Sequence, residues 1–338
     1  MINNDHIAII KRITFRRVWN LALLRYSFLK AKWFKKTSTL GMPFAASIEP
    51  TTACNLGCPE CPSGLKQFTR PTGRLQTDVH EKMLDQLGKQ LFYINYYFQG
   101  EPFLHPDFLG LIRAANKRNI YTATSTNAHF IDEKKAEEII ASGLDRLIIS
   151  IDGLTQETYE QYRRKGKLEK VIEGTKHLVA AKKRMQSKSP HLIFQFLVVR
   201  PNEHEIPAVF ELGKEIGVDE VRLKTAQLYD YENGNPLMPK NEQYARYKKQ
   251  KDGTFTPKYK LLDQCWRMWS STVLTWDGKV VPCCFDKDAH HVLGDIEGEN
   301  FKSIWKNPAY QNFRKAVFTD RQSIDICKNC SEGTEVWA

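Results

Sequence analysis

The sequence predicts an α/β protein, in which a partial (β/α)6, TIM-like barrel is followed by a small cysteine-rich module. Two observations support this prediction. Six β-rich runs alternate with amphipathic helical stretches between residues 45 and 224, an order typical of parallel sheets with right-handed crossovers. Runs such as 146–151 and 193–199 are apolar on both faces, as buried parallel strands are. Six units are too few to close an eight-stranded barrel, so we expect the sheet to stay open.

The boundaries of these elements follow from periodicity and from capping residues. Thr77, Asp132 and Thr155 stand at helix starts, where a side-chain oxygen can accept from a free backbone N–H. Gly143 and Gly217 follow helix ends, as helix-stopping glycines do. In barrels of this kind the chemistry lies at the C-terminal ends of the strands. The predicted strands span residues 45–49, 93–98, 119–125, 146–151, 192–199 and 219–224, and the predicted helices span 77–91, 107–117, 132–142, 155–184 and 204–216.

Residues 1–41 are predicted to form a basic amphipathic N-terminal helix, centred on 8–36. Leu21, Leu24 and Phe28 lie opposite its main apolar seam, and basic side chains surround it. Two interpretations fit: a helix packed on the barrel with its basic side chains reaching solvent, or an interfacial segment on an anionic membrane or an acidic partner. The seam consists of Phe15, Trp19, Ala22, Tyr26, Leu29 and Trp33.

The net charge of +11 is concentrated in this same segment. Residues 1–41 hold nine Lys or Arg against Asp5 alone, so the remaining 297 residues carry only +3. We therefore expect no nucleic-acid partner. No signal peptide is recognisable, and the apolar run 18–24 is too short to span a membrane. We expect a cytoplasmic protein, with the N-terminal helix as its candidate for peripheral membrane contact.

Two further segments follow the barrel region, which we place at residues 42–225. Residues 226–262 are polar and rich in turns and tyrosines, which fits either a connector that partly covers the site or a plain surface linker. Residues 263–338 hold five cysteines, five of the seven tryptophans and a hairpin signature around Asp277-Gly278. A segment of this size has too little aliphatic core to stand alone, so a metal staple is expected.

The eight cysteines fall into two groups, separated by 203 residues without a cysteine. Cys54, Cys58 and Cys61 form a C-x3-C-x2-C triplet directly after the first predicted strand. In a reducing compartment such clusters indicate metal binding or catalysis rather than disulfides. A structural zinc site closes with four ligands, whereas three thiolates suit a cubane iron–sulfur cluster whose fourth iron stays open.

This triplet, followed by alternating βα units, resembles the radical S-adenosylmethionine (radical-SAM) superfamily. The resemblance implies that Cys54, Cys58 and Cys61 hold a 4Fe–4S cluster and that S-adenosylmethionine binds its open iron. It further implies that reductive cleavage of S-adenosylmethionine yields a 5′-deoxyadenosyl radical, which abstracts hydrogen from a substrate C–H bond. An electron donor such as flavodoxin or ferredoxin is expected. Here the cofactor supplies the difficult chemistry and the protein positions it.

The same resemblance assigns cofactor contacts at the ends of the next strands. Gln99-Gly100-Glu101-Pro102 resembles the motif that contacts the S-adenosylmethionine amino group, with Gln99 in place of a glycine. Apart from the family, Glu101 also fits a helix cap and Asp152 an ordinary turn acid. Glu60 stands where an aromatic residue is common near the adenine, which leaves the adenine contacts undefined. The implied cofactor contacts are Gly100, Glu101, Ser125, Asn127, Ser150, Asp152 and Arg163.

The C-terminal module resembles the SPASM and twitch extensions, which carry auxiliary iron–sulfur clusters. A full SPASM domain supplies about seven cysteines for two clusters, whereas the five present here suit one auxiliary 4Fe–4S cluster. Cys284 is either a spare thiol or the true second ligand. A zinc ribbon, with His290-His291 as candidate further ligands, is the alternative that the residues alone leave open. The implied ligands are Cys265, Cys283, Cys327 and Cys330.

Three classes of function fit these residues. We expect a radical-SAM enzyme that oxidises or rearranges a small molecule, with the auxiliary cluster in electron transfer. The alternative is a maturase of a peptide or protein side chain, which we favour less because the N-terminal segment is short for a peptide-recognition domain. A non-catalytic iron–sulfur or zinc protein would have no use for an open three-cysteine site.

Overall fold

The core of the molecule is a sheet of six parallel strands in sequence order, which confirms the predicted partial barrel. The computed structural model describes residues 4–330. Trp337, one of the five tryptophans of the C-terminal segment, therefore lies outside the described residues. Each strand pairs in parallel with the next along the chain. The strands are β1 (Ala45–Ile48), β2 (Tyr93–Asn95), β3 (Tyr121–Thr126), β4 (Arg146–Ser150), β5 (His191–Val198) and β6 (Glu220–Thr225).

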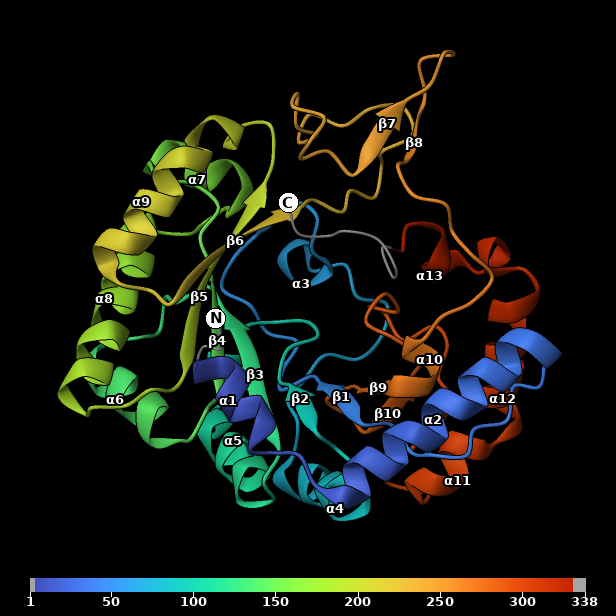
Figure 1. Cartoon of the computed structure of the whole chain (residues 1–338). Coiled ribbons are helices and arrows are strands. Elements are labelled where there is room, and N and C mark those ends of the chain that lie inside the picture. The colour runs from blue at the N-terminus through green and yellow to red at the C-terminus, as the bar shows by residue number, and fades with distance from the viewer. Residues whose placement is uncertain (1–3, 331–338) are drawn as a thin grey trace.

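Helices connect these strands and cover the outer side of the sheet, as Figure 1 shows for α6, α8 and α9 beside β4 to β6. The predicted helix 155–184 is wrong in one respect, because it is two helices separated at Arg163–Lys167. Gly166 lies in this break, where a Cβ would lie 2.7 Å from the Tyr159 ring. The helices are α4 (Thr77–Leu87), α5 (Phe108–Lys117), α6 (Glu133–Ala141), α7 (Gln156–Tyr162), α8 (Leu168–Arg184) and α9 (Ile206–Ile216), with short turns α3 (Pro62–Leu65), η1 (Pro102–Leu104) and η2 (Glu203–Glu205).

The C-terminal module continues the barrel sheet. The predicted hairpin is present as β9 (Ser271–Leu274) and β10 (Lys279–Val281), and β11 (Gly294–Asp295) pairs with β10. Strand β9 also pairs in parallel with β1, in the register Ala45↔Ser271, which covers the edge that β1 would otherwise expose. The sequence did not indicate this pairing, because more than 200 residues separate the two strands. The remaining elements are α10 (Arg267–Ser270), α11 (Phe301–Lys306), α12 (Pro308–Thr319), η3 (Arg321–Ser323) and α13 (Asp325–Lys328).

Residues 226–262 fold against the cysteine loop and carry a small hairpin, β7 (Tyr247–Lys249) and β8 (Phe255–Pro257). Tyr247 and Tyr231 stack with their ring centroids 4.4 Å apart. A separate apolar cluster joins this segment, through Leu228 and Met238, to Leu56 and Cys58 of the cysteine loop. Residues 226–262 therefore pack against one side of the cysteine loop.

The N-terminal region forms two helices, α1 (Asn4–Ile10) and α2 (Phe15–Phe34). Helix α2 begins at Thr14, whose side chain accepts from the Arg17 N–H. Leu24, Phe28 and Ala31 are buried, and the Phe28 ring lies edge-on to Trp269 of the C-terminal module at 5.4 Å. No helix among residues 4–330 is long and apolar enough to cross a membrane.

The predicted apolar seam of this helix is not its packing face, because four of its aromatic side chains are exposed to solvent. The buried face instead combines Leu24 and Phe28 with polar residues. The Arg17 guanidinium donates to the Asn119 carbonyl at 2.7 Å, and the Asn20 amide donates to the Met42 carbonyl at 2.7 Å. The backbone carbonyls of the loops beneath the sheet therefore select a face that hydrophobicity alone does not identify. The exposed aromatics are Phe15, Trp19, Tyr26 and Trp33.

Candidate active site

The cysteine triplet lies in the loop that follows β1, at the C-terminal ends of the parallel strands. Backbone hydrogen bonds hold this loop at both sides: Gly57 N–H donates to Arg164 O at 2.9 Å, and Glu101 N–H donates to Ala53 O at 2.7 Å. Gly100 has φ +75°, and a Cβ there would lie 2.1 Å from the Thr51 carbonyl. A glycine is therefore required at this position, because it lets the loop after β2 lie directly against the cysteine loop.

The three cysteines line one cavity of about 500 Å³ together with most of the predicted cofactor contacts. Asp152 is not at its wall. The Asp152 carboxylate is fully buried behind Arg163, accepting from its Nε at 2.5 Å and from Leu197 N–H at 2.7 Å. Asp152 therefore orients Arg163, which is itself at the wall. The predicted residues that the structure brings together here are Cys54, Cys58, Cys61, Gly100, Glu101, Ser125, Asn127, Ser150 and Arg163.

Glu101 is the principal acidic group beside the cysteines. Its carboxylate accepts from Thr126 Oγ1 and from Asn127 N–H, both at 2.8 Å. It also accepts from Phe103 N–H at 3.3 Å, so Glu101 caps η1 and lines the cavity at the same time. Burial raises the pKa of Glu101 to about 7, although the bonds from Asn127 and Thr126 oppose the shift. A nearby cation would return this carboxylate to its charged form at neutral pH.

The cysteines require positive charge to ionise. Burial raises the pKa of the Cys54 thiol to about 12 and also raises that of Cys58, which the Arg163 guanidinium 3.8 Å from Cys58 Sγ opposes. Bound iron would supply the required charge, because a coordinating thiol loses its proton outright. Within residues 4–330, no three His, Cys, Asp or Glu side chains could hold a single metal ion together. A cubane makes a different demand, since each thiolate binds its own iron, and the donor set fits such a group.

The wall formed by β6, the connector and the C-terminal module is strongly basic, which the sequence did not indicate. Burial lowers the pKa of Lys224 and of Arg246, and Arg246 Nε and Nη1 are buried without a hydrogen-bond partner in the described part of the chain. These side chains come from segments far apart in sequence, so no short sequence motif identifies them. The basic residues at this wall are Lys224, Arg246, Arg267 and Lys287.

The auxiliary cysteines divide into two environments. Arg321 Nη2 lies 3.1 Å from Cys330 Sγ, and the pKa of Arg321 is raised by the neighbouring Cys265, Cys330 and Cys327 although burial opposes this. Cys283 is half-buried, lies close to Cys265 and Cys330, and does not line the main cavity. The predicted ligands Cys265, Cys283, Cys327 and Cys330 are therefore neighbours. Cys284 instead lines the main cavity, 4.0 Å from Arg267 Nη1.

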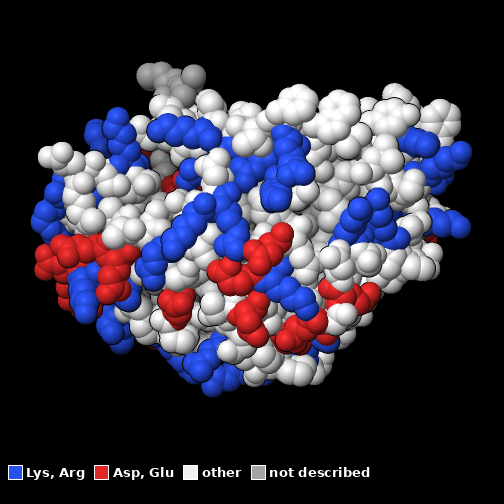
Figure 2. Space-filling model, turned by 90° about the horizontal axis from the view of Figure 1, so that it is seen from below, with Lys and Arg blue, Asp and Glu red and all other residues white. Residues whose placement is uncertain are grey.

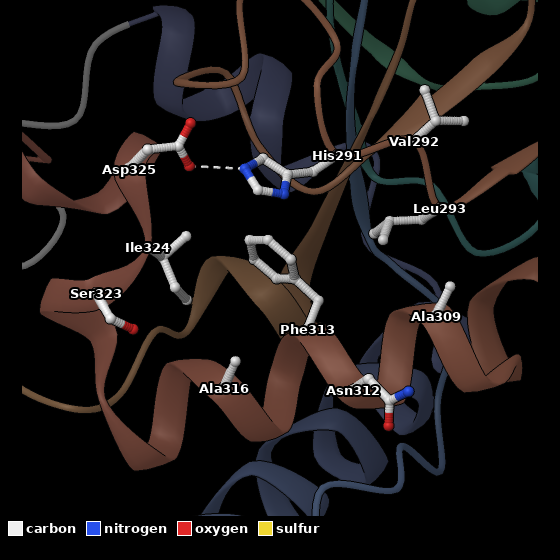
Figure 3. A pocket seen from close by; sticks show the side chains of 10 residues that line it. All are labelled: His291, Val292, Leu293, Ala309, Asn312, Phe313, Ala316, Ser323, Ile324 and Asp325. Carbon is white, nitrogen blue, oxygen red and sulfur yellow. Dashed lines mark hydrogen bonds and ion pairs between the residues drawn. The ribbon is translucent and has the colours of Figure 1, made fainter.

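A second cavity, of about 550 Å³, lies on the C-terminal module and contains no cysteine (Figure 3). His291 Nε2 lies 2.7 Å from Asp325 Oδ1, and its ring meets the Phe313 ring edge-on at 5.3 Å. The His290 side chain is exposed to solvent. Neither histidine belongs to a group of three or more potential metal ligands within residues 4–330.

Comparison with known proteins gives two family matches along the chain. The family model described as the radical SAM superfamily matches residues 48–212, and the SPASM model, described as an iron–sulfur cluster-binding domain, matches residues 265–331. The PqqA peptide cyclase of Gluconobacter oxydans is 26% identical over 321 residues, which cover 87% of this chain and 84% of the relative.

Two solved structures share the fold at low sequence identity. SuiB of Streptococcus suis bound to S-adenosylmethionine superposes with a TM-score of 0.64 at 15% identity, covering 92% of this chain and 76% of SuiB. BtrN in complex with AdoMet and 2-DOIA superposes with a TM-score of 0.55 at 18% identity, covering 86% of this chain and 94% of BtrN.

Proposed function

The chain belongs to the radical-SAM superfamily and carries a SPASM domain, and from that premise we propose that this enzyme modifies a side chain of a peptide. This differs from the small-molecule substrate that the sequence favoured. The observation that carries the proposal is the alignment with a peptide cyclase over nearly the full length of both chains, through the barrel and the SPASM domain. SuiB, which shares the fold, has also been solved with its precursor peptide SuiA.

The basic wall of the cavity supports a substrate that carries a carboxylate. Arg246 offers two buried nitrogens without a partner among the described residues, and an unpaired buried donor costs free energy until a ligand satisfies it. Arg guanidinium groups bind carboxylates in a bidentate manner. We therefore infer that the modified segment contains an acidic side chain, held near Arg246 and Lys287.

The residues of the chain divide the work of holding the cofactors. In this proposal Cys54, Cys58 and Cys61 ligate the 4Fe–4S cluster. Glu101 accepts from the amino group of S-adenosylmethionine, and Arg163 contributes positive charge beside Cys58. When bound, the reduced cluster and S-adenosylmethionine supply a radical able to abstract hydrogen from an unreactive C–H bond.

The auxiliary centre and the electron supply complete the proposal. Here Cys265, Cys283, Cys327 and Cys330 hold the auxiliary cluster of the SPASM domain, which serves electron transfer. A flavodoxin or ferredoxin delivers the reducing electron. Cys284 has no role as a ligand in this arrangement, because its side chain lines the main cavity.

The proposal is tested with the anaerobically reconstituted, reduced enzyme, by measuring 5′-deoxyadenosine formation in the presence of peptide libraries with and without acidic side chains. We expect acidic peptides to accelerate turnover and to change in mass, and the Cys58→Ala variant to form no 5′-deoxyadenosine. An Arg246→Gln variant should raise KM for the peptide more than it lowers kcat. Acceleration by small polyols or amino sugars and by no peptide would instead support a small-molecule enzyme, the candidate that the superposition with BtrN favours.

A further inference from the structure

The outward face of α2 carries four large aromatic side chains that are exposed to solvent. We call Phe15, Trp19, Tyr26 and Trp33 the aromatic stripe; their exposed fractions are 84%, 58%, 60% and 67%. Helix positions advance by about 100° per residue, which places these four side chains along one line of the helix. Leu24, Phe28 and Ala31 lie on the opposite line and are buried. The stripe therefore points directly away from the protein.

Other exposed apolar side chains lie in the same N-terminal part of the chain. Of the eighteen large hydrophobic side chains that are exposed in the described part of the chain, eleven lie within residues 7–40. Such concentration is unusual, since scattered exposed apolar residues are normal but large contiguous patches mark binding surfaces. The members outside the stripe are Ile7, Ile10, Ile13, Val18, Leu21, Phe34 and Leu40.

The charged side chains of α2 itself all have one sign. Helix α2 contains no Asp or Glu, and Arg16, Arg25 and Lys32 are exposed beside the stripe. Asp5 is the sole acid of residues 1–41, and it is buried against Tyr121 and Arg146. Figure 2 shows most acidic side chains of the lower face away from its upper margin, where α1 and α2 lie and where basic and uncharged side chains predominate.

We propose that α2 docks the protein onto a membrane surface that contains anionic lipids. Aromatic rings inserted at the headgroup level and flanked by Lys and Arg are the signature of interfacial helices. The stripe is a ridge on a single helix, which suits a deformable planar surface. A second copy fits poorly, because a two-fold contact would oppose two acid-free basic helices.

The orientation of α2 determines which way the cavity would face. Arg17 donates to carbonyls of Gly88 and Asn119, in the loops that precede β2 and β3, and Asn20 bonds to Met42 just before β1. Helix α2 therefore crosses the N-terminal ends of the strands, whereas the cysteines line a cavity at the C-terminal ends. A docked enzyme keeps its cavity on the side away from the lipid, open to a substrate in water.

The test is sedimentation of the full-length protein with vesicles, comparing pure phosphatidylcholine with equal parts of phosphatidylcholine and phosphatidylglycerol. We expect binding to the anionic vesicles alone, weakened by salt. A Trp19→Ser/Trp33→Ser variant should lose at least about tenfold in vesicle affinity, and an Arg16→Gln/Lys32→Gln variant about fivefold for each charge removed. Deleting the helix is unsuitable, because it would expose the core that Phe28 covers.

Matched controls distinguish docking through α2 from nonspecific adsorption of exposed apolar side chains to vesicles. Phe130→Ser/Phe210→Ser removes two aromatics that are exposed elsewhere and should leave vesicle binding unchanged. Formation of 5′-deoxyadenosine should be unchanged in the Trp19/Trp33 variant, which also shows that the variant folds. Equal binding to both kinds of vesicle, or full binding by the Trp19/Trp33 variant, would overturn the proposal. A dimer in sedimentation velocity that this variant abolishes, without vesicle binding, would assign the face to a second copy.

Discussion

Replacing Glu101 with Gln should improve the pH tolerance of the metal-free protein while weakening the cofactor site. The folded-state pKa of about 7 lies above the ordinary 4.5 of this carboxyl because of burial. Below pH 4.5 the group is protonated in both states, and as pH rises the unfolded chain loses this proton first. Stability therefore falls until the pH passes about 7. Each pKa unit corresponds to about 1.4 kcal/mol, so between pH 5.5 and pH 8 the loss is about 2 kcal/mol.

The assay is urea unfolding of the metal-free wild type and the Glu101→Gln variant at both pH values. The loss of unfolding free energy between pH 5.5 and pH 8 should be about 2 kcal/mol smaller in the variant than in the wild type. The two proteins share all other titrating groups. S-adenosylmethionine affinity of the reconstituted variant should fall about tenfold or more, the cost of a hydrogen bond to a charged group. Glu60→Gln is the control, since the Glu60 carboxylate also lines the cavity but accepts from the connector. An unchanged pH dependence in Glu101→Gln would refute the burial argument.

Three further predictions follow from individual contacts. Arg163→Gln removes the guanidinium that pairs with the fully buried Asp152 carboxylate. The variant should lose about 3 to 5 kcal/mol in the free energy of unfolding, as measured by urea titration. Cys283→Ala should lose the auxiliary cluster, about four irons per chain, whereas Cys284→Ala should keep it; iron and acid-labile sulfide analysis distinguishes them, and the reverse result would make Cys284 the ligand. Phe28→Ala should cost about 3 to 5 kcal/mol, because its ring fills the contact between α2 and the C-terminal module, and a loss below about 1 kcal/mol in urea unfolding would contradict that packing.

The strands and the cysteine loop could be predicted because their signals are local. A parallel strand buried on both faces is a continuous apolar run, as at 146–151, and the C-x3-C-x2-C spacing lies within eight residues. The strand order then follows from chain order, so side chains at successive strand ends, such as Glu101 and Asn127, could be expected to meet.

The parts that sequence reasoning missed depend on contacts between distant segments. The basic wall gathers Lys224, Arg246 and Lys287 from separate elements, and each alone looks like an ordinary surface cation. The packing face of α2 could not be identified from the sequence for a related reason. Arg17 and Asn20 are buried by carbonyls that belong to loops about 20 to 100 residues away, which no periodicity within the helix can show.

The pairing of β9 with β1 has a consequence for the relative position of the two groups of cysteines. Strand β1 leads directly into the triplet, and Cys265 and Cys283 flank the β9–β10 hairpin. Adjacent strands stand about 4.8 Å apart, so the backbone hydrogen bonds between β1 and β9 fix where the cysteines of the C-terminal module lie relative to the triplet. A one-residue insertion in β9 would turn its side chains to the other face and shift the cysteines of the C-terminal module relative to the triplet. The C-terminal module is consequently part of the same sheet as the barrel, and it cannot be exchanged as an independent domain without moving its cysteines relative to the triplet.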